Sequence, residues 1–233
     1  MINGKTVLGV IPARGGSKGI PRKNVLDISG KPLIAWTIEA GHQSSYIDRL
    51  ILSSDDDEIM KVAASCGCDI PFVRPAELAT DLTPGIEPVL HAIAELPDYD
   101  YLVLLQPTSP LRTAEDIDRC IETCLSSKAP ACVSVVQLDK SPQWMYSLDD
   151  SWRMTSMFGN RPLLERRQDS ETVYVLNGAV YVAEVEYLRS QHSFITSKTV
   201  AYPMIKERSV DIDSWWDWRL AEWLLRERME TSG

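Results

Sequence analysis

Short apolar runs and helix-like patterns alternate along the first 137 residues. Runs without polar alternation are typical of strands buried on both faces of a parallel sheet. These runs lie at 6–11, 49–53, 69–73, 101–105 and 131–137. Apolar residues with helical spacing lie between them, at 32–43, 56–66, 84–96 and from Thr113 onward. This alternation predicts an α/β fold with a mostly parallel sheet and helices on both faces.

The pattern breaks after residue 137. Residues 139–176 have weak periodicity and are richer in Arg, Asp, Ser and aromatic residues. Their content of Trp, Met, Tyr and Leu is too high for a disordered spacer, so we interpret them as an excursion within one domain spanning residues 1–233. Strand-like runs return at 180–183 and 199–202.

A final helix is predicted to begin at Ser214, with the acidic residue Asp217 three positions later. Its apolar positions follow helical spacing, so we expect them to form a buried stripe rather than a surface for stacking a ligand. These positions are Trp216, Leu220, Trp223 and Leu224.

Composition and charge narrow the class of protein. The formal net charge of −9 argues against nucleic acid as a partner, because phosphate backbones require clustered Lys and Arg. No apolar run approaches the ~20 residues of a bilayer-spanning helix, and no signal-peptide pattern precedes the first strand. The odd number of cysteines, five, fits reduced thiols. We therefore expect a cytoplasmic protein with no membrane partner.

A glycine-rich basic loop, residues 12–24, follows the first predicted strand. Ligands of open α/β sheets bind beyond the carboxyl ends of the strands, which is where this loop lies. Gly15, Gly16 and Gly19 allow backbone N–H groups to approach phosphate oxygens. Four cations accompany them in an otherwise acidic chain: Arg14, Lys18, Arg22 and Lys23. The loop matches neither the P-loop nor the dinucleotide fingerprint, and a mobile, solvated basic loop is the alternative interpretation.

Polar residues also follow the strand at 101–105. Gln106 and Thr108 are expected at the same sheet edge as the glycine-rich loop, and Arg112 would add a cation there. The alternative is a proline-rich turn that only caps the next helix, since Pro107 and Pro110 fit such a turn.

Two aspartates near the C-terminus share one side of a predicted extended segment. In residues 209–213 polar and apolar positions alternate, which places Asp211 and Asp213 on the same side. Mg²⁺ usually binds one or two carboxylates and completes its shell with phosphate and water. Capping or solvated aspartates before the last helix would show the same spacing, so both readings stay open.

Six motifs in order resemble the acylneuraminate cytidylyltransferase family, also called CMP-sialic acid synthetases. They cover nearly the whole chain, and the set is far more specific than any one of them. The motifs are IPARGGSKGIPRKN (11–24), LSSD (52–55), RPAELATD (74–81), LLQPTSPLR (104–112), LNGAVY (176–181) and SVDID (209–213).

The resemblance implies a Rossmann-like nucleotidyltransferase fold and a homodimer formed through the excursion at 139–176. It implies that the anomeric hydroxyl of an acidic α-keto sugar attacks the α-phosphate of CTP, with Mg²⁺ as cofactor and pyrophosphate as leaving group. Aromatic residues of the excursion suit a buried interface between subunits. These are Trp144, Tyr146, Trp152 and Phe158.

The matched positions also imply a set of site residues. The nucleotide-binding set is Ala13, Arg14, Gly15, Gly16, Ser17, Lys23, Asn24, Arg74 and Gly85. The sugar-binding set is Gln106, Thr108, Arg167 and Asn177. Asp211 and Asp213 are the metal ligands, and the residues expected to act directly in catalysis are Arg14, Lys23 and Asp211.

The chain departs from well-known sialic acid members at two cations near the sugar. It has Ser141-Pro-Gln-Trp144 where they place a lysine after a proline, and Val175 where they carry an arginine. This favours a differently substituted sugar such as legionaminic acid, unless Arg153, Arg161, Arg166 or a partner subunit supplies the charge. Alternatives are an eight-carbon ulosonate, another nucleotide, or a non-catalytic nucleotide-binding homologue.

Overall fold

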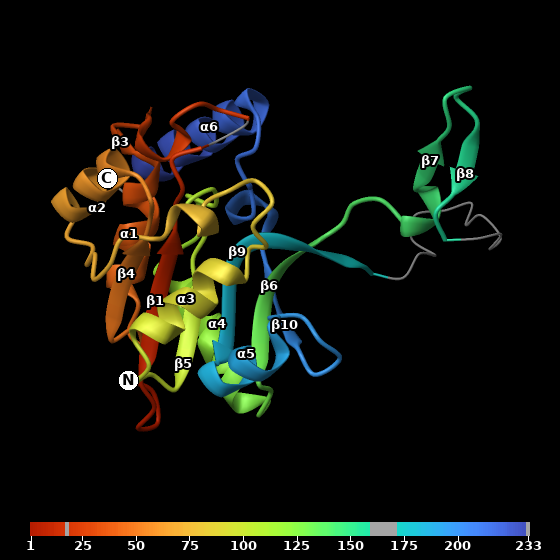
Figure 1. Cartoon of the computed structure of the whole chain (residues 1–233). Coiled ribbons are helices and arrows are strands. Elements are labelled where there is room, and N and C mark those ends of the chain that lie inside the picture. Colours follow the sequence, from red (N-terminus) through yellow and green to blue (C-terminus); the bar gives the residue numbers. More distant parts are fainter. Residues whose placement is uncertain (17–18, 159–171, 232–233) are drawn as a thin grey trace.

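A computed structural model describes residues 1–16, 19–158 and 172–231 of the chain. A six-stranded sheet in the order β10-β6-β9-β5-β1-β4 forms its centre (Figure 1). Its strands are β1 (Val7–Pro12), β4 (Arg49–Ser53), β5 (Tyr101–Leu104), β6 (Ala131–Gln137), β9 (Tyr174–Glu184) and β10 (Val200–Met204). β1 pairs with β4 and β5 in parallel, and β10 pairs with β6 in parallel, whereas β9 is antiparallel to both of its neighbours. The predicted α/β class with a mostly parallel sheet is confirmed.

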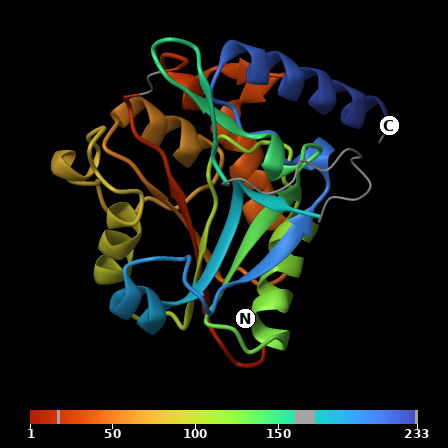
Figure 2. The same ribbon diagram turned by 90° about the vertical axis from the view of Figure 1, so that its right-hand side faces the viewer.

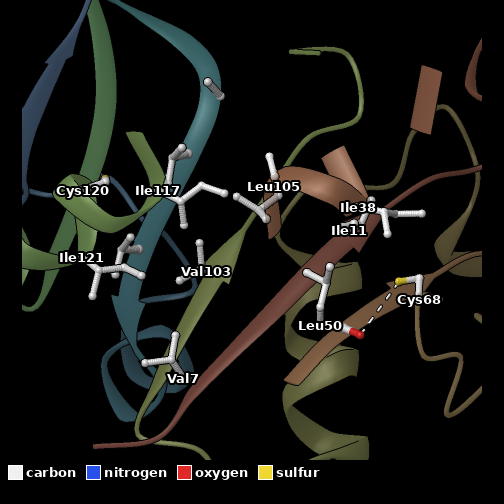
Figure 3. Packing of buried hydrophobic residues seen from close by; sticks show 14 of the residues in the cluster. Val7, Ile11, Ile38, Leu50, Cys68, Val103, Leu105, Ile117, Cys120 and Ile121 are labelled. Atoms are coloured by element: carbon white, nitrogen blue, oxygen red, sulfur yellow. Dashed lines mark hydrogen bonds between the residues drawn. The ribbon is translucent and has the colours of Figure 1, made fainter. Parts of the chain in front are cut away.

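Helices cover both faces of the sheet (Figures 1 and 2). They are α1 (Leu33–Gln43), α2 (Asp57–Ser65), α3 (Glu87–Glu95), α4 (Ala114–Ser126), α5 (Val185–Gln191) and α6 (Trp215–Thr231). Successive residues of β1 alternate between two apolar layers. Val7 and Ile11 pack in the layer of α1 and α4, and Leu8 and Val10 pack in the layer of α3 and α5. Figure 3 shows the first layer, where Ile11 lies near Ile38 of α1.

Smaller elements complete the described chain. Two-stranded pairs are formed by β2 (Asp27–Ile28) with β3 (Lys31–Pro32) and by β7 (Tyr146–Leu148) with β8 (Met154–Ser156). The 3₁₀ turns are η1 (Lys23–Val25), η2 (Ala76–Leu78), η3 (Pro142–Trp144) and η5 (Lys206–Arg208). No helix among the described residues is both long and apolar enough to cross a bilayer.

Capping residues fix where two helices begin. Thr113 and Asp116 form a reciprocal capping box at α4, as their spacing predicts. Asp56 accepts hydrogen bonds from the N–H groups of Glu58 and Ile59 and so begins α2. These caps fix the direction in which each chain segment leaves the carboxyl edge of the sheet.

Two details of the elements were not predicted correctly. Residues 69–73 make only an isolated bridge between Asp69 and Ile51, because Pro71 has no N–H group to donate to a ladder. The strand predicted at 180–183 is confirmed as part of the longer β9, but α5, which follows it directly, was not predicted. A seven-residue helix offers too few turns for a clear periodicity.

The excursion projects from the sheet as an arm. The β7–β8 hairpin stands clear of the sheet and its helices in Figure 1. Its apolar side chains are exposed, with Trp152 at 81% and Phe158 at 52%. β9 already begins at Tyr174, so the sheet resumes before the predicted end of the excursion at residue 176. Residues 159–171 lie outside the described chain.

Helix α6 buries a different face from the predicted stripe. Its buried side chains are Trp218, Ala221 and Leu225, which pack in a cluster that also holds Ile20 and Leu111. The stripe prediction is therefore wrong: of its members, Trp216 (75%), Trp223 (58%) and Leu220 (38%) are exposed, and only Leu224 is partly buried. Apolar residues occur on more than one side of α6, so periodicity alone could not identify the buried side.

This assignment predicts opposite effects for two tryptophans of α6. Trp218→Ala should lower the free energy of unfolding by about 3–5 kcal/mol, because it empties a buried site. Trp216→Ala should change it by less than about 0.5 kcal/mol, because that side chain faces solvent. Urea unfolding followed by circular dichroism measures both, and equal losses in the two variants would contradict the assigned face.

Candidate active site

A pocket of about 440 Å³ lies at the carboxyl edge of the sheet. Adjacent parallel strands β1 and β5 end there, so the loops that follow them meet at one place. The lining includes several residues predicted from the sequence: Arg14, Gly16, Lys23, Asn24, Arg74, Gly85, Gln106, Thr108 and Asp213. The two loops and the aspartate segment that the sequence singled out are therefore brought together.

Close packing of the protein chain on itself favours glycine at two positions of the loop after β1, Gly15 and Gly19. A Cβ at Gly15 would lie 2.6 Å from Oδ2 of Asp56, and one at Gly19 would collide with the carbonyl oxygen of Asp213. The N–H of Gly15 donates to Oδ1 of Asp55 at 3.1 Å. Gly16, by contrast, faces open space and lines the pocket, so its backbone can approach a ligand. Ser17 lies outside the described residues.

Carboxylates of the protein neutralise two of the loop cations. Nη2 of Arg14 lies 2.7 Å from Oδ1 of Asp81. Arg22 binds Asp56 at 2.5 Å and also Glu58, and these contacts raise its pKa. Arg22 therefore has anionic partners within the protein and does not need a phosphate to balance its charge. Lys18 lies outside the described residues.

Lys23 joins the glycine-rich loop to the aspartate segment. Its side chain is buried, and Nζ donates to the carbonyl of Ile212 and lies 3.7 Å from Oδ1 of Asp213. Asn24 donates weakly, at 3.5 Å, to the carbonyl of Arg14. Two segments far apart in sequence are thus held against each other at the pocket.

Arg74 is a buried cation in the pocket wall. Its Nε donates to Oγ of Ser53 at 3.0 Å, and a second bond reaches the Ser53 carbonyl. Burial lowers the pKa of Arg74 to about 10, with the nearby charge of Asp55 opposing this shift and that of Arg14 adding to it. A phosphate next to Arg74 and Arg14 would offset this unfavourable environment.

Asp211 and Asp213 differ in burial. Oδ1 of Asp211 is buried and has no hydrogen-bond partner among the described residues, whereas Asp213 is exposed and lines the pocket. Burial raises the pKa of Asp211, and the charge of Asp213 raises it further, while contact with Thr108 opposes the shift. An unpartnered buried carboxylate oxygen beside a second carboxylate fits a cation such as Mg²⁺. The described residues contain no group of three or more His, Cys, Asp or Glu side chains that could hold a metal ion. An ion at Asp211 and Asp213 would therefore also need oxygen atoms from a bound phosphate or from water.

A second, smaller pocket of about 250 Å³ adjoins the first. The two share Gly85, Leu104 and Gln106. The rest of its lining is largely apolar or aromatic: Ile86, Tyr181, His192, Ser193, Phe194 and Ile195. The sequence analysis did not assign these residues to the site. Tyr181 closes the LNGAVY motif and could have been found from it, but no pattern singles out Phe194.

Other predicted residues have different positions. The prediction that Arg112 adds a cation to the main pocket is wrong. Its buried guanidinium donates instead to the carbonyls of Gln106 (3.2 Å) and Ala179 (2.7 Å) and to Oγ1 of Thr37 (2.7 Å). Arg112 thus fixes the backbone of Gln106 through a hydrogen bond to its carbonyl. Ala13 is buried, and its N–H donates to the Ser53 carbonyl at 3.0 Å.

Asn177 is buried and bonded within the protein. Its Oδ1 accepts from Oγ of Ser134 at 2.6 Å, and its Nδ2 donates to Oγ of Ser209 at 3.0 Å. These bonds hold β9 to β6 and to the segment that leads to Asp211. Asn177 lies outside the lining of both pockets, so its contact with a sugar stays a prediction. Arg167 lies outside the described residues.

The burial of Asp211 makes a prediction for the ligand-free protein. A carboxylate whose pKa is raised by folding stabilises the protein below its unfolded pKa, about 3.9, and loses that contribution as pH rises. Asp211→Asn should therefore be more stable than wild type at pH 7 by about 1 kcal/mol, with a smaller gain near pH 4. Urea unfolding in EDTA measures this, with the exposed Asp213→Asn as the control expected to change little. A destabilised Asp211→Asn protein at pH 7 would contradict the assigned environment.

Comparisons with known proteins agree with this geometry. A family model described as cytidylyltransferase matches residues 8–202. N-acylneuraminate cytidylyltransferase of Escherichia coli is 37% identical over 217 residues, which are 92% of this chain but 51% of that protein. The chain thus spans about half the length of that relative. CMP-N,N'-diacetyllegionaminic acid synthase of Legionella pneumophila is 36% identical over an alignment of 237 positions, which covers 96% of this chain and 98% of that protein.

A solved structure confirms the fold. CMP:2-keto-3-deoxy-manno-octonic acid synthetase, determined in complex with CTP, has a TM-score of 0.74 over 96% of this chain and 99% of that one. Its sequence identity is 16%, so this likeness concerns the nucleotidyltransferase fold alone. With the family model matching most of its length, the chain belongs to the cytidylyltransferase family.

Proposed function

We propose that this chain transfers CMP from CTP to the anomeric hydroxyl of a nonulosonic α-keto acid sugar and releases pyrophosphate. The observation that carries the proposal is the pocket in which Arg14, Lys23 and Arg74 converge beside Gln106 and Asp213. Three cations suit a triphosphate, and the acidic pair suits a metal bound to it. The relatives named for N-acylneuraminate and N,N'-diacetyllegionaminic acid support the class of sugar.

The cations act by neutralising and positioning the triphosphate. Arg14 and Lys23 reach the pocket from the glycine-rich loop, and Arg74, which is bound to Ser53 at the end of β4, lies near Arg14. Phosphoryl-type transfer depends largely on such positioning and charge stabilisation. The buried amine of Lys23 and the buried guanidinium of Arg74 are pre-oriented by their bonds to Ile212 and Ser53, so little reorganisation is needed.

The adjoining pocket supports an N-acylated sugar. Gln106 lies between the two pockets and can orient the sugar toward the α-phosphate. The methyl groups of acyl substituents suit the apolar surface formed by Tyr181, Phe194 and Ile195. Together with Gln143 and Val175, which stand where well-known sialic acid members carry two cations, this favours a diacetylated legionaminic-type acid.

Mg²⁺ is the proposed cofactor, held by Asp211 and Asp213. When bound, it would withdraw charge from the phosphate oxygens. The attacking hydroxyl forms a bond to the α-phosphorus, and the bond to the β-phosphate breaks, so that pyrophosphate leaves with the electron pair. The hydroxyl proton must go to a nearby acceptor, and we propose the carboxylate of Asp211, whose Oδ1 has no hydrogen-bond partner among the described residues.

The exposed arm supports a homodimer. Trp152, Phe158 and Leu148 present apolar surface away from the sheet, and such surface is usually covered by a partner. In a two-fold dimer, arms from both subunits would meet at the axis. We also propose a cytoplasmic location, which the five unpaired cysteines support. Recovery of the protein in a secreted fraction would refute that location.

The reaction can be tested by pyrophosphate release with CTP, Mg²⁺ and a panel of sugars. N-acetylneuraminic, legionaminic and pseudaminic acids carry acyl groups, and an eight-carbon ulosonic acid does not. We expect the highest kcat/KM with one N-acylated nine-carbon acid, and no activity when ATP, GTP or UTP replaces CTP. Activity only with the eight-carbon acid would refute the sugar assignment, and CTP binding without release would favour a non-catalytic homologue.

The dimer can be tested by light scattering at micromolar concentration. Wild type should scatter at twice the chain mass of 26.2 kDa. Trp152→Ser combined with Phe158→Ser should shift the particle toward the monomer, because both changes remove apolar surface from the arm. The same exchange at Trp216 of α6 is the control. A monomeric wild-type protein would refute the proposal.

A further inference from the structure

One ion pair spans the mouth of the main pocket. Arg14 belongs to the glycine-rich loop after β1, and Asp81 belongs to the segment between η2 and α3. Nη2 of Arg14 lies 2.7 Å from Oδ1 of Asp81, and both residues line the pocket. The side chains are 34% and 44% exposed, so a ligand entering the pocket can reach the pair.

The turn that carries Asp81 is held by local bonds. Oγ1 of Thr80 and Oγ1 of Thr83 are 2.7 Å apart, and the Thr83 hydroxyl donates to the carbonyl of Glu77 at 3.0 Å. The N–H of Thr83 donates to the carbonyl of Thr80 at 3.3 Å. These bonds involve neither Arg14 nor the Asp81 side chain, so they hold the backbone around Asp81 independently of the ion pair.

The charges around Arg14 explain why a carboxylate is favourable there. Arg14 lies close enough to the buried Arg74 to lower the pKa of Arg74. Two neighbouring guanidinium groups repel each other unless an anion lies beside them. Asp81 supplies that anion in the free protein, and phosphate oxygens would supply it in the complex.

We propose that Asp81 competes with the polyphosphate of the substrate for Arg14 and thereby sets how tightly polyphosphates bind. This inference rests on the proposed function, which places the triphosphate at Arg14. Asp81 is a positioning residue that acts through Arg14 and takes no part in the bond changes. A phosphate oxygen can take the Nη2 position of the guanidinium only when the Asp81 carboxylate leaves it, so the two compete for this part of Arg14.

The competition also assists departure of pyrophosphate. Once the bond between the α- and β-phosphates has broken, the β,γ-unit is held by noncovalent contacts only. Arg14 can then return to Asp81, which lowers the affinity of the site for the leaving group. An enzyme without this carboxylate would hold both CTP and pyrophosphate more tightly.

The test compares how tightly polyphosphates bind to variants in which charged side chains of this region are replaced by neutral ones. Asp81→Asn removes the competing carboxylate and keeps the size of the side chain. Glu77→Gln is the matched control, because Glu77 lies four residues earlier in η2, is exposed and gives the same change in net charge. Arg14→Gln and the double variant Arg14→Gln/Asp81→Asn complete a double-mutant cycle. Calorimetry gives the dissociation constants of inorganic tripolyphosphate and of CTP, each with Mg²⁺.

We expect Asp81→Asn to bind both ligands about two- to fivefold more tightly than wild type, the range for an exposed ion pair. Pyrophosphate should inhibit Asp81→Asn at correspondingly lower concentration. Glu77→Gln should differ from wild type by less than about 1.5-fold, because screening weakens a more distant charge. In the Arg14→Gln background, Asp81→Asn should have no further effect.

Two outcomes would overturn the inference. One is an Asp81→Asn protein that binds tripolyphosphate no more tightly than wild type or Glu77→Gln. The other is an equal gain with and without Arg14, which would show that Asp81 acts only through its general charge. Tripolyphosphate contains no cytidine, so the measurement with tripolyphosphate decides the role of Asp81 even if CTP proves not to be the substrate.

Discussion

The buried amine of Lys23 holds two parts of the site next to each other, the cationic loop after β1 and the aspartate segment before α6. Its contacts with the Ile212 carbonyl and with Asp213 join the loop after β1 to the segment that precedes α6. From the other side, the N–H of Ile212 donates to the carbonyl of Thr108 at 2.9 Å, next to Gln106. Residues 211–213 are therefore fixed between the two loops that leave β1 and β5. Without these tethers the acidic pair would have no defined position relative to the cations.

The sheet explains why residues so distant in sequence converge. β1 and β5 are parallel neighbours, so the loops that follow them share an edge. β9 runs antiparallel between β5 and β6, follows the arm in the chain and carries Tyr181, which lines the smaller pocket. Arg112 joins the loop after β5 to β9, because its guanidinium donates to the carbonyls of both Gln106 and Ala179. The site is thus built on strand ends and buried hydrogen bonds, which hold its groups more firmly than free loops could.

Features that depend on neighbouring residues in the sequence were predicted well, whereas features that depend on contacts between distant residues were not. The strands at 49–53 and 131–137 and the capping box at Thr113 follow from neighbouring residues, and each was predicted to within a residue. The buried face of α6 depends on what Trp218 meets in three dimensions, and the role of Arg112 depends on carbonyls far away in sequence. The sequence showed a cluster of cations after β1. Only the fold shows that Asp56 and Asp81 lie beside Arg22 and Arg14.

The close packing at Gly19 has a consequence for engineering this enzyme. The space where a side chain would begin is already filled by the carbonyl oxygen of Asp213. Libraries that diversify the loop to accept other nucleotides should therefore keep Gly19 constant and vary Gly16, whose surroundings are open. A loop transplanted from a distant homologue would need a glycine in this same register. Without it, the incoming loop would displace Asp213 before any new contact with a nucleotide could form.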